Sequence, residues 1–266
     1  MSKPTFLVIG AKKAASTWLY SILRQYPDIW CPPVKELHYF LTPQVLASAK
    51  ARTYESVLNG NSFIAEKDRW FYHNYLLKQE NNDEWYFSLF PDNEQLVCGD
   101  VDPNLCSISE EHIQQVYTAN PNFKLIIVLR DPVQRIWSHF KMIAELKKIS
   151  IGDIVHSNNS AYDHVFDKSS YKKMLSRWLK YFPKENILFL NYDDIKHNPL
   201  SIQASIEQFL GVEHHPIDGL GEVVNPSAMG GNEIPPKVYE ILAGMMLEHK
   251  KYACDLLGVG LGEMLA

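Results

Sequence analysis

The sequence predicts an α/β fold: a P-loop-like parallel sheet flanked by helices on both faces, within a single domain. Three apolar runs predict the strands: "TFLVIG" at 5–10, "KLIIVLR" at 124–130 and "NILFLNY" at 186–192. Runs that are apolar throughout are typical of strands covered on both faces. Helical patterns follow the strands at 16–26, 131–146 and about 200–210. This order of strand and helix favours a parallel sheet with right-handed crossovers.

Local signals mark the ends of these helices. Pro27 stops the first helix, and "GV" at 211–212 ends the third. Asp131 is a good N-cap for the second helix, and Pro132 suits its first turn. Each predicted strand therefore leads through a short loop into a defined helix start.

Two further sections complete the chain. Residues 41–98 are dense in aromatic side chains and predict short helices packed over the sheet. The final stretch, 235–258, predicts a helix with apolar residues at helical spacing, namely Val238, Ile241, Leu242, Met245 and Met246. No repeat, low-complexity tract or linker divides the chain, so we expect one domain over residues 1–266.

Composition excludes several classes of function. The net charge of −5, from 26 basic and 31 acidic residues, does not favour nucleic-acid binding. There is no long apolar span, so we expect no membrane insertion and a cytoplasmic location. The four cysteines form no CxxC pair, which predicts reduced thiols and no structural metal. None of these patterns predicts an oligomeric state.

The loop after the first strand has the setting of a phosphate-binding loop. The triphosphate motif G-x-x-x-x-G-K-[ST], placed on Gly10, puts Ser16 where the motif has its lysine. The lysines instead come earlier, at Lys12 and Lys13. A helix N-terminus with small residues and hydroxyls can still bind an anion, and a shorter phosphate without metal fits best. The alternative is a plain strand–loop–helix turn with a serine cap and solvated lysines.

A second candidate anion site follows the second strand. Arg130 stands at the carboxyl end of that strand, the edge at which open α/β sheets bind ligands. Ser138 lies two turns into the next helix, where its hydroxyl can share a phosphate with the arginine fork. The alternative pairs Arg130 with Asp131 or Asp102 and leaves Ser138 facing solvent. Together the two sites predict one nucleotide with phosphates at both ends.

Three motifs in this order resemble a known family. "GAKKAASTWL", "KELHYF" and "LRDPVQRIWSHF" look like sulfotransferases that use 3′-phosphoadenosine-5′-phosphosulfate (PAPS), most of all the heparan-sulfate and bacterial small-molecule branches. The later stretches "SSYKKMLSRWLKYFPKENILFLNYDDIKHNP" and "IEQFLGV" also resemble that family. The resemblance therefore spans most of the chain.

The resemblance implies which residues bind the donor. In that family the first loop holds the 5′-phosphosulfate with help from a lysine, here Lys13, and an arginine and a serine hold the 3′-phosphate. The positions implied in this chain are Lys12, Lys13, Ala14, Ala15, Ser16, Thr17, Trp18, Arg130 and Ser138. Tryptophans such as Trp18 can stack on adenine, although core packing is their commoner role. No metal is implied.

The segment "KELHYF" carries the expected base. Glu36 matches the glutamate that family members use as base, and His38 is the second candidate, as base or as the group that orients Glu36. A carboxylate in aromatic surroundings would have a raised pKa, which suits a base. Lys35 is expected to be solvated. The alternative is a surface Lys–Glu pair beside a half-buried histidine.

Two stretches depart from the family pattern. "GDVDPNLC" at 99–106 places Asp100 at a family glutamate, to touch the acceptor or brace the site, but has Val101 where the heparan enzymes have lysine. Near 225–236 the chain lacks the basic loop that closes over the 3′-phosphate, and its first basic residue there is Lys237. Backbone amides or Lys237 are the candidates to replace that loop.

The sequence thus predicts a PAPS-dependent sulfotransferase that acts by in-line displacement on a hydroxyl, or less favourably an amine. Residues 41–98 and 147–170 are expected to shape the acceptor pocket, and the aromatic content favours a neutral small molecule over a charged glycan. The alternatives are a P-loop small-molecule kinase and a non-catalytic nucleotide-binding relative. The missing motif lysine disfavours the kinase.

Overall fold

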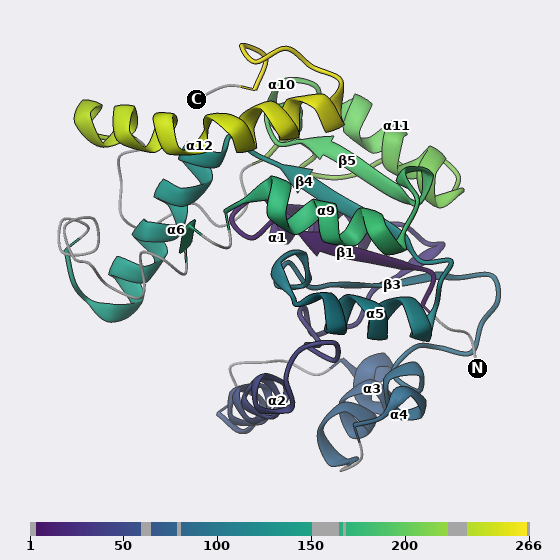
Figure 1. Ribbon diagram of the computed structural model, residues 1–266. Coiled ribbons are helices and arrows are strands. Elements are labelled where there is room, and N and C mark those ends of the chain that lie inside the picture. The colour runs from purple at the N-terminus through teal and green to yellow at the C-terminus, as the bar shows by residue number, and fades with distance from the viewer. Residues whose placement is uncertain are drawn as a thin grey trace.

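The sheet has five parallel strands in the order β2-β3-β1-β4-β5 (Figure 1). The computed structural model describes residues 4–59, 65–78, 81–150, 165–166, 169–222 and 233–264. The strands are β1 (Phe6–Gly10), β2 (Ile29–Trp30), β3 (Val97–Val101), β4 (Lys124–Leu129) and β5 (Ile187–Asn191). The three predicted strands are confirmed to within one residue at each end.

The register of the central strands is tight. Phe6 of β1 pairs with Gly99 of β3 on one side and Lys124 of β4 on the other. A Cβ atom at Gly99 would lie 2.4 Å from the Phe6 ring, so this position requires glycine. The same glycine interrupts the apolar run of β3, which explains why the sequence pattern did not predict that strand.

Helices join and cover the strands, which confirms the predicted α/β sheet with flanking helices. Figure 1 shows α5 and α9 in front of the sheet. The α-helices are α1 (Ser16–Leu23), α2 (Pro43–Leu58), α3 (Arg69–Tyr72), α4 (Asp83–Phe87), α5 (Glu110–Ala119), α6 (Pro132–Lys147), α9 (Tyr171–Tyr181), α10 (Asp194–His197), α11 (Pro199–Leu210) and α12 (Pro236–Leu257). Shorter 3-10 or π turns are η1 (Glu66–Asp68), η2 (His73–Leu77), η3 (Leu105–Ser107) and η4 (Lys184–Asn186).

The predicted helix signals act as expected at two ends. The Asp131 carboxylate accepts from the backbone N–H groups of Val133 at 2.9 Å and Gln134 at 3.0 Å, and so caps α6. Gly211 adopts a left-handed φ of 76° and ends α11. Helix α1 stops at Leu23, earlier than expected, because the chain already turns ahead of Pro27.

The aromatic section 41–98 lies elsewhere than predicted. It contains the 16-residue helix α2 besides short helices. Figure 1 shows α2, α3 and α4 beyond the side of the sheet that β2 and β3 form, rather than over its faces. Trp30 of β2 packs against this section, with its ring centroid 5.8 Å from that of Trp70 on α3 and 5.6 Å from that of Phe90, which follows α4. The section extends the core sideways from the edge strand.

The predicted closing helix is confirmed as α12, although its apolar residues divide between two faces. Leu242 and Met246 are buried in a cluster with α6, whereas Ile241 and Met245 are 60% and 48% exposed. No helix in the described part of the chain is both long enough and apolar enough to span a membrane. The predicted loop at 229–232 and most of segment 147–170 lie outside the described residues.

Candidate active site

The predicted anion-binding loop and Arg130 lie at the carboxyl ends of two neighbouring strands, and Asp102, which was not predicted, lies at the end of a third. The loop 11–15 follows β1, Asp102 follows β3, and Arg130 follows β4. Because β1 lies between β3 and β4, their carboxyl ends form one edge, which is where open α/β sheets bind ligands. The fold therefore brings both predicted anion sites together.

The loop after β1 is held in an unusual backbone conformation. Gly10 has a φ of 149°, and Lys13 and Ala15 are left-handed, with φ of 66° and 60°. Non-glycine residues rarely adopt this conformation, and such residues cluster at ligand sites. Ala15 is the N-cap of α1, and no side chain caps this helix. The first N–H groups of α1 thus remain open to an anion, where the sequence alternative expected a serine cap.

Arg130 is tied to this loop. Its Nη1 donates to the Lys13 carbonyl oxygen at 3.2 Å, and its guanidinium lies 4.4 Å from the Tyr192 ring centroid. In the described part of the chain Arg130 forms no ion pair with Asp131 or Asp102, so the alternative pairing is not found. Asp131 instead pairs with Lys250 at 2.8 Å. The Arg130 guanidinium therefore lies next to the loop that follows β1.

Several cations gather around Lys13. Burial lowers the pKa of Lys13, Glu145 opposes this shift, and the nearby cations Arg130, Lys12 and Lys141 lower it further. Mutual repulsion of this kind would be relieved by a bound anion. These cations fit a phosphorylated ligand.

Lys141 was not singled out from the sequence. It is 5% exposed, and burial lowers its pKa, with Arg130 adding to the shift and Glu145 opposing it. Lys141 stands three residues after the half-buried Ser138 on α6, so the two share a helix face. That spacing in "SHFK" was the signal that could have identified it.

Lys35 corrects a prediction. It was expected to be solvated, but its Nζ donates to Ser16 Oγ at 3.2 Å, to Thr17 Oγ1 at 3.3 Å and to Glu36 Oε1 at 3.1 Å. Its side chain is only 18% exposed. The left-handed φ of 65° at Glu36 turns the backbone between the two side chains. Lys35 therefore contacts both the loop–helix element and the predicted base.

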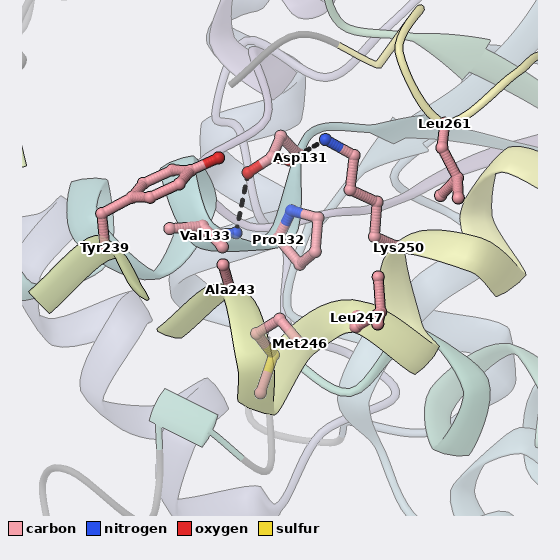
Figure 2. Close-up of a pocket in the computed structure, with 9 residues that line it drawn as sticks. All are labelled: Asp131, Pro132, Val133, Tyr239, Ala243, Met246, Leu247, Lys250 and Leu261. Carbon is pink, nitrogen blue, oxygen red and sulfur yellow. Dashed lines mark hydrogen bonds and ion pairs between the residues drawn. The ribbon is translucent and has the colours of Figure 1, made fainter. Parts of the chain in front are cut away.

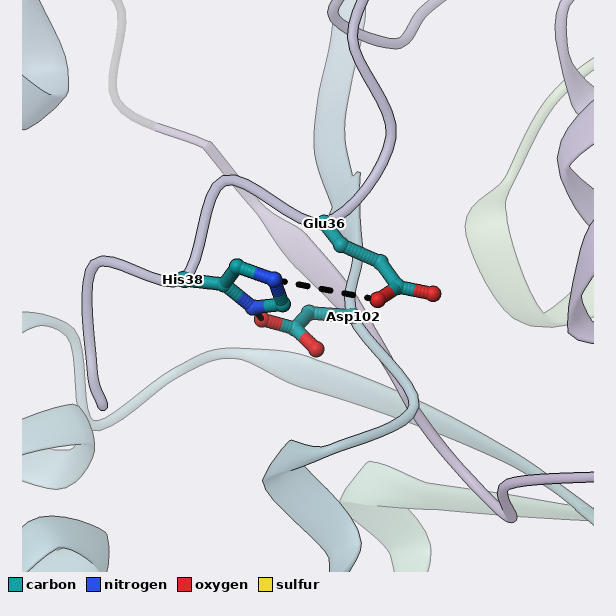
Figure 3. Close-up of side chains that lie close together, drawn as sticks. All are labelled: Glu36, His38 and Asp102. Carbon is teal, nitrogen blue, oxygen red and sulfur yellow. Dashed lines mark hydrogen bonds and ion pairs between the residues drawn. The ribbon is translucent and has the colours of Figure 1, made fainter. Parts of the chain in front are cut away.

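Glu36, His38 and Asp102 form a cluster beside it (Figure 3). His38 Nδ1 lies 2.8 Å from Asp102 Oδ2, and His38 Nε2 lies 3.8 Å from Glu36 Oε2. Asn104 Nδ2 donates to Glu36 Oε2 at 3.1 Å and to Asp102 Oδ1 at 2.8 Å. The carboxylate of Glu36 thus faces a cation, an amide and an imidazole, where aromatic surroundings were predicted.

The pKa of His38 is raised above its ordinary value. Burial by itself lowers this pKa, but the hydrogen bond and charge of Asp102, together with the charge of Glu36, outweigh it. An aspartate on Nδ1 also fixes the orientation of the ring and leaves Nε2 toward Glu36. Asp102 and Asn104 were not predicted from the sequence. Ligand atoms of Glu36, His38 and Asp102 lie within 4.8 Å of one another, as a metal site would need, but they are engaged with each other and Asn104.

The other predicted residues lie deeper. Asp100 is 2% exposed, and burial, with the charge of Asp102 adding to it, raises its pKa to about 8. The Trp18 ring is 2% exposed within the core, which matches the packing role rather than stacking on a ligand.

A pocket of about 220 Å³ opens between the start of α6 and α12 (Figure 2). Its lining combines the Asp131–Lys250 ion pair with apolar side chains, including Val133 and Met246. It adjoins Arg130 through Asp131 and was not predicted from the sequence.

The comparisons with known proteins agree with this geometry. The profile of the sulfotransferase family matches residues 4–216. A sulfotransferase from Alicyclobacillus acidocaldarius shares the fold with a TM-score of 0.67 and 19% identity over 99% of both chains. The chain belongs to the sulfotransferase family, which confirms the family resemblance found in the sequence.

Curated relatives fall in the same family. The membrane-associated sulfotransferase kil1 of Dictyostelium discoideum is 22% identical, over 79% of this chain and 56% of that protein. The bifunctional heparan sulfate N-deacetylase/N-sulfotransferase 1 of Caenorhabditis briggsae is 24% identical, over 82% and 24%. The human heparan sulfate glucosamine 3-O-sulfotransferase 5 is 32% identical, over 40% and 33%. The chain thus matches between a quarter and just over half of the length of these relatives.

Proposed function

We propose that this chain transfers a sulfuryl group from PAPS to the hydroxyl of a small-molecule acceptor, with an amine as the less favoured acceptor. The observation that carries the proposal is the meeting of two chemically opposite groups of residues at one sheet edge. One is the set of cations around the open N-terminus of α1. The other is the Glu36–His38–Asp102 cluster.

The donor fits the first group. In this proposal the loop and first turn, Ala14 to Thr17, bind the 5′-phosphosulfate through backbone N–H groups and hydroxyls, with Lys12 and Lys13 adding charge. Trp18 contributes its backbone N–H. Arg130 and Ser138 hold the 3′-phosphate, and the buried Lys141 adds a cation beside them. Ser16 in place of the triphosphate lysine suits this donor and disfavours a kinase.

The second group supplies the proton chemistry. Glu36 takes the proton of the acceptor hydroxyl while the acceptor oxygen bonds to sulfur, and the bond from sulfur to the bridging oxygen of the phosphate breaks. That oxygen leaves with the electron pair, and Lys13 and the α1 N-terminus stabilise its charge. His38, held by Asp102, orients Glu36 and is the second candidate for the base. Most of the catalysis is then positioning and electrostatics.

A neutral or apolar small molecule is the proposed acceptor. Its support is the acidic net charge of −5 and the aromatic section beyond β3. Because some relatives are named for heparan sulfate, a polysaccharide is the alternative acceptor for this chain. A cytoplasmic location is also proposed, on the support of four buried free cysteines; a membrane-associated relative makes cell fractionation the check.

The test is a transfer assay with PAPS and no added metal. Formation of the desulfated product, 3′-phosphoadenosine-5′-phosphate (PAP), would be followed by mass spectrometry with phenols, alcohols, amines and a glycosaminoglycan, for the wild type and Glu36→Gln. We expect turnover on a small hydroxyl compound, unchanged by EDTA and lost in the variant. Turnover on the polysaccharide alone would overturn the acceptor class. PAP binding without transfer to any acceptor would favour the non-catalytic relative.

A further inference from the structure

Lys35 occupies a bridging position at the site. Its ammonium is directed to three acceptors: Ser16 Oγ at 3.2 Å, Thr17 Oγ1 at 3.3 Å and Glu36 Oε1 at 3.1 Å. An ammonium carries three protons to donate, so these contacts use all of them. Nothing in the proposed donor and base roles so far employs this side chain.

The contacts with Ser16 and Thr17 direct their hydroxyls. Each hydroxyl has one proton to donate and lone pairs to accept. Because Lys35 occupies a lone pair on each oxygen, the hydroxyl protons remain for another acceptor. Both hydroxyls lie in the first turn of α1, whose N-terminus has no side-chain cap. An anion at this N-terminus would receive those protons.

Lys35 and Asn104 together hold the Glu36 carboxylate, each through a different oxygen atom. Oε1 accepts from Lys35, and Oε2 accepts from Asn104 Nδ2 at 3.1 Å. Two donors on separate oxygens leave the carboxylate little rotational freedom. Its backbone is constrained as well, with a left-handed φ of 65°.

We propose that Lys35 is a positioning residue that couples the donor-binding hydroxyls to the base. One ammonium sets the direction of the two hydroxyls and the orientation of the Glu36 carboxylate. The bound sulfuryl donor and the base that takes the acceptor proton are thereby held in a fixed relative position. The role rests on the proposed function. It predicts that loss of Lys35 weakens donor binding and slows transfer together, although Lys35 itself need not touch the reacting atoms.

The first test measures PAP affinity by calorimetry, which needs no acceptor. We expect Lys35→Met to weaken PAP binding by about tenfold, the scale of one charge-assisted contact. Lys35→Arg should recover most of this affinity because it keeps the charge. The control is Lys180→Met, which removes the exposed Lys180–Glu110 pair between α9 and α5 and should leave the affinity unchanged.

A double-mutant cycle adds a readout that a merely structural lysine would not move. If Lys35 directs the Ser16 hydroxyl, Lys35→Met with Ser16→Ala should bind PAP about as well as Lys35→Met alone. With an acceptor from the transfer assay, Lys35→Met should lower kcat by about 100-fold while KM for the acceptor changes little, and Lys35→Arg should restore part of kcat.

The outcomes separate the two proposals. A wild type that does not bind PAP overturns the proposed function and the role of Lys35 with it. A wild type that binds PAP, with an unchanged affinity and kcat in Lys35→Met, overturns only the role of Lys35, as do fully additive effects in the cycle. Circular dichroism checks folding, and Lys35→Gln replaces Lys35→Met in the same measurements if the methionine variant does not fold.

Discussion

The proposed donor side and the proposed acceptor side of the site are built in different ways. The donor side consists of loops that directly follow β1 and β4, and its contacts are carried by cations such as Lys13 and Arg130. The acceptor side is an irregular segment, with left-handed residues at Glu36 and His38, fastened to the end of β3 by Asp102 and Asn104. Both sides depend on contacts between distant parts of the chain. They differ in that β1 and β4 were predicted from the sequence, whereas β3, which carries Asp102, was not.

The two sides suit different electrostatic tasks, namely binding an anion and accepting a proton. An anionic donor needs fixed positive charge, which in the proposal comes from Arg130 and the N-terminus of α1. A proton acceptor needs carboxylates and an imidazole whose charges depend on each other, which the cluster of Glu36, His38 and Asp102 provides. Donor binding and proton transfer should therefore respond to different substitutions.

The largest expected effect is on the acceptor side. Glu36→Gln should lower turnover by about 1,000-fold or more, because the amide cannot take the acceptor proton. PAP affinity by calorimetry should stay within about twofold. Near-normal turnover of Glu36→Gln would show that Glu36 is not the base and would assign this role to His38.

The donor-side counterpart is Lys13→Ala. Loss of the cation next to the leaving oxygen should lower kcat by about 100-fold to 1,000-fold while PAP still binds. Steady-state kinetics against PAPS would measure the effect, with Lys180→Met again as the control. If kcat is unchanged and only the KM for PAPS rises, Lys13 serves binding rather than transfer.

Asp102→Asn tests whether Asp102 controls the pKa and the orientation of His38. Without the aspartate charge the pKa of His38 should fall, and turnover should drop by about tenfold as the ring loses its fixed orientation. NMR titration of the His38 ring would measure the pKa. Because the pKa of His38 is raised in the folded state, protonated His38 stabilises the fold fully below about pH 6.5, the value in the unfolded chain. This stabilisation is lost as the pH rises through the folded-state pKa. The Tm deficit of the variant should thus grow from pH 7.5 to 5.5, and a deficit independent of pH would contradict the assignment.

The last prediction concerns the effect of the buried Asp100 on stability rather than on turnover. Its pKa of about 8 means that the folded state holds a proton that the unfolded chain releases near pH 4. Stability should then fall between about pH 4 and 8, by at most about 1.4 kcal/mol per pH unit. Asp100→Asn should raise Tm relative to the wild type, more at pH 8 than at pH 5. Equal Tm differences at both pH values would show that Asp100 ionises normally.

The contrast also explains what the sequence could predict. Strands β1, β4 and β5, the α6 cap at Asp131 and the loop with Lys12 and Lys13 follow from apolar runs and short-range signals, and all these elements are found. A family match to residues 4–216 agrees with the motifs that suggested it. Roles of individual donor-side residues remain predictions.

The acceptor side was harder to predict for physical reasons. Lys35 was expected to be solvated because a Lys–Glu pair in sequence does not reveal the left-handed turn at Glu36 that places the ammonium against Ser16. Asp102 contacts His38, which lies 64 residues away in the sequence. Asp102 also follows β3, a strand that was not predicted because Gly99 interrupts its apolar run. Contacts of this kind depend on tertiary structure, which single-residue patterns do not encode.

The most direct test of the central claim is calorimetric binding of PAP without magnesium, compared with ATP and 5′-AMP, for the wild type and Arg130→Ala. The claim predicts that the wild type prefers PAP over 5′-AMP by about 100-fold, in line with a buried charge-assisted phosphate contact, and that Arg130→Ala loses most of this preference. Equal binding of PAP and 5′-AMP, or binding of ATP that requires magnesium, would contradict the assignment of this sheet edge to a PAPS donor.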